Sequence, residues 1–229
     1  MLHVVVLSGA GVSAESGLAT FRDSGGLWEG FSIEDVASIE GWYRDKKRVL
    51  EFYNKRREQA ATAKPNSGHR AIAELEEFFR VSVVTQNVDD LHEKAGSTNV
   101  IHLHGMLREA RSEKDPEYVV DIGNRPIEPG EKAPDGSQLR PNVVWFGEAV
   151  PMIEVAAEAV MKADIFIVVG TSLAVYPAAG LINYTKNSID KYVVDPSVPD
   201  MYLTDEWEHI KKGAATGLPE LKEKLISNL

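Results

Sequence analysis

The chain has 229 residues, 43% of them hydrophobic and 26% charged, which is typical of one globular domain or of one domain with a small insert. Its formal net charge of −10 argues against nonspecific nucleic-acid binding. It has no cysteine, which excludes disulfides, cysteine-ligated zinc and thiol catalysis. We expect a cytoplasmic protein without a membrane span, because Gly170 and Pro177 interrupt the uncharged stretch 165–182.

Residues 4–8 are predicted to form a buried strand that leads into a glycine-rich loop starting at Gly9. Gly9 and Gly11 fit the dinucleotide pattern G-x-G-x-x-G only in its looser form, because Ala14 stands at the third glycine position. The pattern G-x-x-x-x-G-K-[ST] fails because no lysine follows Gly17. We expect the backbone amides of residues 10–12, and likewise those of residues 170–172, to hold a diphosphate.

Two helices and two strands follow in the first half of the chain. Asp45 can cap a helix over 45–63, whose apolar residues recur at helical spacing, and residues 67–79 form a second amphipathic helix. Residues 81–85 are predicted to form a β-branched strand. Residues 100–103 form another, which ends on His104 and Gly105.

Between residues 112 and 141 the composition shifts toward Pro, Gly and charged residues, which indicates a small module or a long excursion. Only residues 118–122 in this stretch are typical of a strand. Beyond it we expect strands at 143–146, 165–169 and 192–194 and helices at 153–162, 177–186 and 218–229.

Strands that are apolar on both faces and alternate with helices predict an α/β fold with a Rossmann-like, doubly wound parallel sheet. In such sheets ligands lie at the carboxyl ends of the strands. Four strand ends are rich in glycine or polar residues: 9–23, 86–92, 104–106 and 170–180. His104 is a candidate general base there, and His102 on the same strand face is the competing candidate.

Five segments together resemble the sirtuins, a family of NAD-dependent protein deacylases. They are GAGVSAESGLATFR (9–22), TQNVDDLH (85–92), HLHG (102–105), VVWFGE (143–148) and GTSLAVYPAAG (170–180). The resemblance implies that NAD is the cosubstrate and that acylated lysine-containing proteins or peptides are the partners. It also implies a single catalytic domain over 1–229. Its Rossmann-like part would cover about 1–30, 80–106 and 142–229, and its small module about 31–79 and 107–141.

The resemblance also assigns roles to residues. His104 matches the catalytic histidine. Residues 144–148 match the strand that pairs with the substrate peptide, a recognition mode in which the ligand adds a β-strand: Val144, Trp145, Phe146, Gly147 and Glu148. The implied NAD-binding residues are Gly9, Ala10, Gly11, Ser13, Ala14, Phe21, Arg22, Gln86, Asn87, Asp89, Gly170, Thr171, Ser172, Asp195 and Ala215.

In the chemistry that the resemblance implies, the acyl-lysine amide oxygen attacks C1′ of the nicotinamide ribose and nicotinamide leaves. His104 then takes a proton from a ribose hydroxyl, which attacks the imidate carbon. The products are free lysine, nicotinamide and O-acyl-ADP-ribose. A water-excluding segment near Phe21 would protect the cationic intermediate.

The chain departs from the family pattern at two places. Sirtuins usually carry two C-x-x-C pairs that hold zinc after the catalytic histidine, whereas this chain has Ser112, Ala133 and Gly136 where ligands are expected. We therefore expect no zinc or other metal, and a module held by packing and prolines. Near Asp195 the family often has an asparagine that binds the adenosine ribose, and Val193 stands at its place.

Tyr53 and Arg56 lie at i, i+3 spacing and resemble the Tyr-x-x-Arg pair of class III sirtuins, which recognise acidic acyl chains. A guanidinium binds a carboxylate bidentately and a phenol adds a donor, so the pair predicts succinyl and malonyl preference with some deacetylation. The alternative is that Tyr53 packs in the core and Arg56 belongs to a solvated basic run.

Two other functions fit the same loops. One is an NAD-dependent ADP-ribosyltransferase or NAD hydrolase, against which residues 143–148 and the Tyr53/Arg56 pair argue. The other is a noncatalytic NAD-binding module, which would not need His104, Asn87 or Asp89. We expect a monomer, and the sequence does not identify the protein substrates.

Overall fold

The computed structural model of the protein describes residues 1–19, 27–28, 31–197 and 204–229. Its main sheet has six strands, all paired in parallel, in the order β11-β10-β9-β1-β4-β5. The chain runs outward from β1 to β4 and β5, crosses back to β9 beside β1, and runs outward again. The predicted doubly wound parallel sheet is confirmed. The strands are β1 His3–Ser8, β4 Arg80–Thr85, β5 Val100–His102, β9 Ile165–Val169, β10 Asp190–Val194 and β11 Trp207–Ile210.

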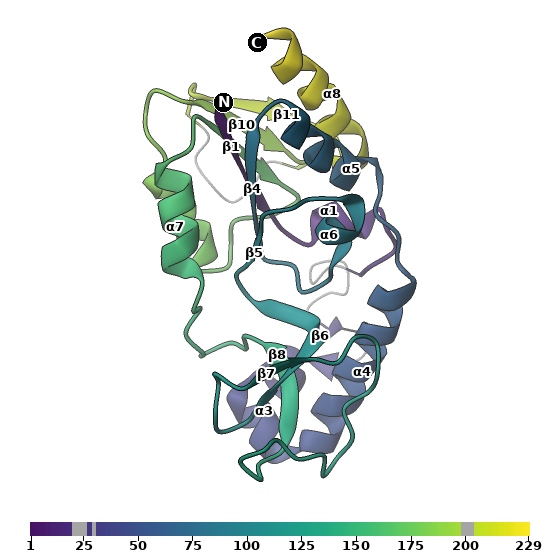
Figure 1. Ribbon diagram of the computed structural model, residues 1–229. Helices are drawn as coiled ribbons and strands as arrows, with labels where there is room; N and C mark the ends of the chain where they lie inside the picture. The colour runs from purple at the N-terminus through teal and green to yellow at the C-terminus, as the bar shows by residue number, and fades with distance from the viewer. Residues whose placement is uncertain (20–26, 29–30, 198–203) are drawn as a thin grey trace.

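Helices cover both faces of this sheet because its central strands are apolar on both faces. All six residues of β1 are buried. Val4 and Val6 belong to the core shared with α5 and α8, and Val5 and Leu7 to the core shared with α7. Figure 1 shows α5 and α8 together on one side of the sheet and α7 on the other.

The helices of this layer begin and end close to their predicted positions. They are α5 Ser67–Glu74 with the 3₁₀ turn η1 Leu75–Glu77, α7 Ile153–Met161 and α8 Ala214–Ser227, with the short α1 Gly11–Ala14 and α6 Leu91–Ala95 at strand ends. Asn66 caps α5 by accepting from the amides of Gly68 and His69. The predicted helix 177–186 is instead the 3₁₀ helix η2 Ala178–Tyr184.

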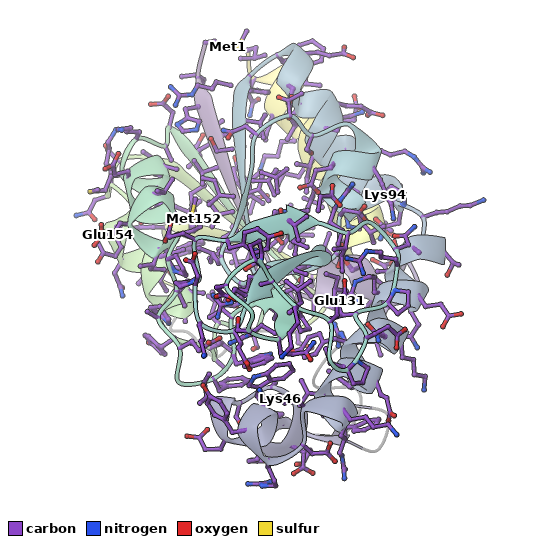
Figure 2. All side chains as sticks on the ribbon, turned by 60° about the horizontal axis from the view of Figure 1, so that its bottom comes forward. Met1, Lys46, Lys94, Glu131, Met152 and Glu154 are labelled. Carbon is purple, nitrogen blue, oxygen red and sulfur yellow. The ribbon has the colours of Figure 1, made fainter. Side chains whose placement is uncertain are left out.

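A smaller module lies at the opposite end of the molecule from both termini (Figure 1). Its three-stranded antiparallel sheet, in the order β7-β6-β8, comprises β6 Gly105–Ser112, β7 Val119–Asp121 and β8 Leu139–Val143. Helices α2 Ile33–Val36, α3 Ile39–Arg44 and α4 Lys46–Thr62 belong to the same module, as do the short strands β2 Leu27–Trp28 and β3 Phe31–Ser32. Figure 2 shows Lys46, the first residue of α4, at the far end of the molecule from Met1.

The structure also differs from the sequence-based expectations in the following places. β8 ends at Val143, so most of the predicted strand 143–146 is irregular, and Phe146 makes only an isolated bridge with Ser38. Strand β11 was not predicted. Helix α5, expected in the small module, packs instead on the main sheet, because Ala71, Ile72 and Leu75 are part of its core.

Three polar residues join the turns of the small module at the place where the resemblance implied zinc. The Ser112 hydroxyl donates to Asp135 Oδ2 (2.5 Å) and accepts from the amides of Lys114 and Asp115 (both 3.0 Å). The Ser137 hydroxyl and amide both donate to Asp135 Oδ1, at 2.6 and 2.9 Å. We call Ser112, Asp135 and Ser137 the serine–aspartate clasp.

The clasp does not fit a zinc ion. Structural zinc takes four thiolate or imidazole ligands, and the clasp offers two hydroxyls and one carboxylate that already bond to one another. Ala133 and Gly136 have no side chain that can ligate a metal. Among the described residues no group of three or more His, Cys, Asp or Glu residues is placed to hold a metal ion.

A helix that crosses a bilayer needs about 20 predominantly apolar residues. None of the helices among the described residues is both long and apolar enough to meet this requirement.

Candidate active site

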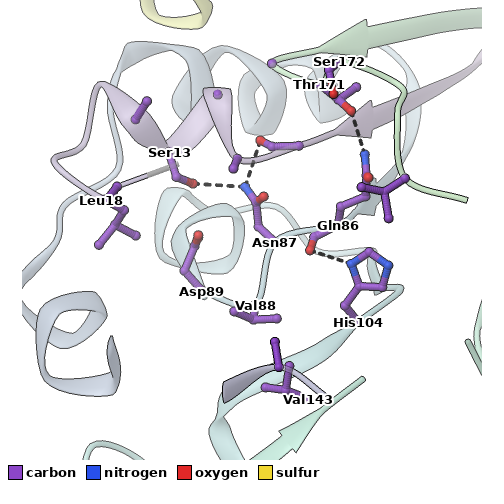
Figure 3. A pocket seen from close by; sticks show the side chains of 18 of the residues that line it. Ser13, Leu18, Gln86, Asn87, Val88, Asp89, His104, Val143, Thr171 and Ser172 are labelled. Carbon is purple, nitrogen blue, oxygen red and sulfur yellow. Dashed lines mark hydrogen bonds between the residues drawn. The ribbon is translucent and has the colours of Figure 1, made fainter. Parts of the chain in front are cut away.

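A cavity of about 770 Å³ lies where the carboxyl ends of the main-sheet strands face the small module. Its walls come from the ends of β1, β4, β9 and β10, from α4, and from the segment that follows β8. Figure 3 shows labelled side chains from the segments after β1, β4, β5 and β9 pointing toward one another across it. The prediction that the glycine-rich and polar strand ends converge on one crevice is therefore confirmed.

The loops after β1 and β9 touch backbone to backbone at the floor of the cavity. The Gly11 amide donates to the Gly170 carbonyl (2.8 Å). A Cβ atom on Gly170 would lie 2.4 Å from the amide nitrogen of Val12, and Gly170 has a φ of +58°. Only glycine is compatible with both the contact and the backbone angle.

This contact corrects one expectation about the diphosphate. The amides of Gly11 and Val12 donate to the carbonyls of Gly170 and Gly9, and the Gly170 amide donates to the Val194 carbonyl. Three of the six amides expected to hold phosphate thus have partners within the protein. The Gly11 amide joins the two loops, the Val12 amide closes its own loop, and the Gly170 amide bonds to the end of β10.

Residues 86–89, which follow β4, tie the two loops to the rest of the site. The Asn87 amide group donates to Gly9 O and to Ser13 Oγ, both at 3.1 Å, and Gln86 Nε2 donates to Thr171 Oγ1 at 3.0 Å (Figure 3). Asp89 is buried, and burial raises the pKa of its carboxyl above the usual value despite a hydrogen bond from the Leu91 amide. These side chains are fixed before any ligand enters.

His104 lines the cavity between β5 and β6. Its Nδ1 lies 3.0 Å from the Gln86 carbonyl oxygen, which can only accept, so Nδ1 carries the proton and Nε2 keeps a lone pair. Burial lowers the pKa of the ring below its usual value. Gly105 must follow it, because a Cβ there would fall 2.0 Å from the Asn142 carbonyl oxygen.

His102, the competing candidate, has both ring nitrogens engaged. Nδ1 lies 3.0 Å from the Asn87 carbonyl oxygen and Nε2 lies 2.7 Å from Glu93 Oε1. Burial alone would lower its pKa, but the hydrogen bond and charge of Glu93 outweigh burial and the pKa is raised. His102 therefore positions the backbone of Asn87, while His104 has the geometry of a general base.

Tyr53 and Arg56 extend from α4 into the same cavity. Tyr53 is 3% exposed, and its hydroxyl oxygen lies 2.9 Å from Trp145 Nε1. The Arg56 guanidinium lies 5.7 Å from the centre of the Phe52 ring and is half-buried. In the basic run Lys55-Arg56-Arg57, the core residue is Arg57, which donates to the Leu107 carbonyl at 2.5 Å.

The segment expected to pair with a substrate peptide borders the cavity through all five of its residues. The Val144 amide donates to the His104 carbonyl (2.9 Å), which joins the segment to the candidate base. The two carboxylate oxygens of Glu148 are occupied by Arg140, Arg111 and the Trp145 amide. The Glu148 carboxylate therefore stabilises the conformation of this segment through bonds within the protein.

The far end of the cavity lies beside β10. Asp195 borders it, and its Oδ1 accepts from the Ser197 amide (2.8 Å). Val193 is fully buried in the core on the α7 side of the sheet, which leaves no ribose contact at that position. Ala215 bonds through its amide to Glu15 Oε2, and Gly213 and Ala214 line the cavity in its place.

Phe21 and Arg22 lie outside the described residues. Of the other residues predicted to bind NAD or substrate, all but Ala215 border the cavity. Sequence reasoning missed several apolar wall residues, such as Val88, Leu107 and Val150, and the acidic Glu15. Such residues carry no motif, and only the folded chain brings them to one wall.

The residues present fit the dinucleotide that the resemblance implies. The glycine-rich loops that follow β1 and β9 both border the cavity, and its volume lies within the usual range of ligand sites, roughly 300–1,000 Å³. Asp195 at one end can accept from ribose hydroxyls. His104 at the other end can accept a proton from one.

Comparison with protein families gives one match across most of these elements. Residues 9–177 match the model of the Sir2 family. An NAD-dependent protein deacylase of Bacteroides thetaiotaomicron is 51% identical over 231 residues, covering 99% of each chain. Another from Helicobacter pylori (strain 26695) is 48% identical over 226 residues, covering 99% of this chain and 98% of the relative.

Solved structures with the same arrangement include one of a Sir2 homologue in complex with NAD. It has a TM-score of 0.89 and 38% identity, covering 99% of this chain and 90% of that one. A structure of Sir2 bound to an acetylated peptide has a TM-score of 0.76 and 28% identity, covering 98% and 92%.

Proposed function

The chain belongs to the Sir2 family, and on that premise we propose that it removes succinyl and malonyl groups from protein lysines in preference to acetyl groups. NAD-dependent protein deacylation is the activity named for relatives that match nearly the whole chain. The preference for acidic acyl groups is the finer part of the proposal. It depends on residues that border the cavity on the side of α4.

The observation that carries the proposal is that the Tyr53 phenol and the Arg56 guanidinium border the same cavity as His104. A carboxylate transferred from water into a buried site loses its hydration and needs charged or polar partners. Arginine supplies a planar pair of donors and tyrosine supplies one more. An acetyl group is smaller and uncharged, so it needs neither.

NAD supplies the electrophilic ribose carbon that the acyl oxygen attacks, and the protein supplies positioning and one proton acceptor. His104, neutral because burial lowers the pKa of its ring, accepts the proton of a ribose hydroxyl at Nε2. Gln86 and Asn87 donate from their side-chain amides to the two glycine loops, which fixes the loops that would hold the cosubstrate. The apolar side chains of Val88 and Leu107 help to exclude water.

The test is a mass-spectrometric assay with NAD and three matched lysine peptides: acetylated, succinylated and malonylated. We expect the acidic acyl groups to leave faster, with O-acyl-ADP-ribose formed. NAD consumption without unmasked lysine would instead favour ADP-ribosyl transfer or NAD hydrolysis. Equal or faster deacetylation would leave the family activity in place and remove the acyl preference.

Arg56→Met sharpens the same test. Removing a charged partner from a bound carboxylate weakens binding by about 1.5–3 kcal/mol, which corresponds to about a 10- to 100-fold fall in desuccinylation relative to deacetylation. Lys55→Met is the matched control, because Lys55 is exposed on the same helix and does not border the cavity. Equal loss of both activities in Arg56→Met would indicate that Arg56 supports the fold.

A further inference from the structure

Trp145 belongs to the small-module core and also borders the cavity, as Tyr53 does. It is 2% exposed and packs between Trp42, with ring centres 5.5 Å apart, and Tyr53, with ring centres 6.3 Å apart. Its indole Nε1 lies 2.9 Å from the Tyr53 hydroxyl oxygen. The two residues are 92 positions apart in the chain, so the fold alone brings them together.

The chemistry of this pair fixes the direction of the hydrogen bond. An indole N–H can only donate, so the Tyr53 oxygen must accept from Trp145. The phenol proton cannot then point at Trp145, and it remains available to the cavity that Tyr53 lines. Accepting one hydrogen bond also polarises the hydroxyl and makes it a better donor.

The phenol stays a donor at neutral pH. Burial raises the pKa of Tyr53 to about 12, so that the proton is held through the working range. A phenolate at this place would repel an acidic acyl chain.

A buried ionic assembly holds the indole in place. The Arg140 guanidinium lies 3.3 Å from the centre of the Trp145 ring. Arg140 also binds both oxygens of Glu148, at 2.8 and 3.0 Å, and the Glu148 carboxylate accepts from the Trp145 amide at 2.8 Å. A cation over an indole face is attracted to the ring and draws electron density from it, which strengthens the N–H as a donor.

We propose that Trp145, braced by Arg140 and Glu148, is a positioning residue for acyl specificity. It directs the Tyr53 hydroxyl proton toward acyl chains that end in a hydrogen-bond acceptor. The inference rests on the proposed preference for acidic acyl groups and adds to it a residue outside the Tyr53/Arg56 pair. Trp145 acts through Tyr53, and its contribution exists only while the phenol is present.

Trp145→Phe tests the inference because it keeps an aromatic ring and removes the N–H. We expect the ratio of desuccinylation to deacetylation to fall about 5- to 10-fold, as for the loss of one hydrogen bond, mainly through a higher KM for the succinylated peptide. In a Tyr53→Phe background the same change should lower the ratio no further, since coupled residues are not additive.

Trp42→Phe is the matched control. Trp42 lies in the same core, and its indole N–H donates to Glu113 at 3.0 Å instead of to Tyr53. This variant should leave the ratio at the wild-type value. Two results would overturn the inference. One is a ratio of desuccinylation to deacetylation in Trp145→Phe that equals the wild-type ratio. The other is a further fall in this ratio when Trp145→Phe is added to Tyr53→Phe.

The wild-type assay separates the two proposals. A wild-type enzyme that prefers the succinylated peptide while Trp145→Phe keeps that preference contradicts the role of Trp145 alone. A wild-type enzyme without the preference contradicts the proposed function, and the role of Trp145 fails with it.

Discussion

His102 is the last residue of β5, His104 lies two residues further along the chain, and the two rings have different surroundings. His104 donates from Nδ1 to the Gln86 carbonyl and borders the cavity, whereas His102 is bonded on both sides, to the Asn87 carbonyl and to Glu93. Their pKa values move in opposite directions: burial lowers that of His104, and Glu93 raises that of His102. The motif HLHG contains both residues, and their hydrogen bonds give them separate tasks.

Because the two pKa values shift in opposite directions, the pH dependence of kcat shows which histidine is the base. If neutral His104 is the base, activity should fall only when the pH drops below about 6.5, the ordinary histidine value, because the lowered pKa keeps the ring neutral to more acidic pH. If His102 were the base, the fall would begin above that value. The measurement is kcat between pH 5 and 9 with saturating NAD and peptide.

Substitution separates the same two residues. His104→Ala removes the proton acceptor, and we expect a loss of roughly 10²- to 10⁴-fold in kcat. His102→Asn keeps a polar side chain beside Asn87. We expect its kcat to be lower than that of wild type but to fall at the same acidic pH. A His104→Ala enzyme with full deacylation would contradict the assignment of the base.

At the scale of the elements, the strands of the main sheet were predictable because each is a short run of β-branched residues apolar on both faces. β1, β4, β9 and β10 all contain predicted strands. The three-stranded sheet of the small module was predicted only in part. β6 carries charged residues at Arg108 and Glu109, and β11 has Glu208 and His209 at the sheet edge, so neither has the apolar signal of a central strand.

The serine–aspartate clasp supports a prediction about the stability of these turns. Ser112→Ala removes the acceptor of two backbone amides and a donor to Asp135, and an unsatisfied buried group costs about 1–3 kcal/mol. We expect the free energy of unfolding to fall by that amount in urea titrations. Ser188→Ala, at an exposed position, is the control and should change stability little.

If Ser112→Ala is as stable as wild type, the module is held by its apolar core and the clasp is incidental. The hydrogen bonds of the Ser112 and Ser137 hydroxyls hold the pKa of Asp135 at about 2. Because its value in the unfolded chain is higher, the clasp stabilises the fold above about pH 4, and this stabilisation is lost as the pH falls toward 2.

A buried histidine pair joins β1, α5 and α6 beneath the glycine loops. His69 and His92 have ring centres 5.0 Å apart, and His92 Nε2 lies 3.0 Å from Ser8 Oγ. Burial lowers their pKa values to about 4 and about 3. Both rings are neutral in the fold, whereas the unfolded chain binds protons near pH 6.5.

Stability should therefore fall as the pH drops from about 6.5 toward 4, by roughly 1.4 kcal/mol per pH unit for each such ring. Urea unfolding at pH 7, 6 and 5 measures this dependence. His69→Gln lacks the titrating ring and should show a shallower dependence on pH. An unchanged slope in His69→Gln would mean that other groups cause the acid sensitivity.

At the scale of the whole molecule, the cavity lies between two parts with separate cores, one around the main sheet and one in the small module. The polar strand ends of the first part could be predicted, because parallel strands bring their carboxyl ends to one edge. The pairs Tyr53–Trp145 and Arg140–Glu148 could not, since no local pattern encodes which core side chains meet. The motifs therefore predicted which strand ends meet at the cavity, but not which core side chains support its walls.

Filling this cavity should stabilise the molecule as a whole. We expect ADP-ribose at 100 times its Kd to increase the free energy of unfolding by about 2.7 kcal/mol, measured as a rise in Tm. His104→Ala should keep this response, because His104 is assigned to proton transfer and not to the diphosphate. Adenosine, which lacks the diphosphate, should stabilise less, and an absent response to ADP-ribose would contradict dinucleotide binding at the strand ends.

The serine–aspartate clasp also determines which chemical agents can disrupt the small module. A thiolate-bound zinc module can be dismantled by peroxide, by alkylating reagents or by a chelator, since each attacks the sulfur or the metal. Hydroxyl and carboxylate groups react with none of these, and the chain contains no cysteine. We expect the enzyme to keep working in zinc-starved or oxidised cells, where its activity would follow the supply of NAD and not that of metal.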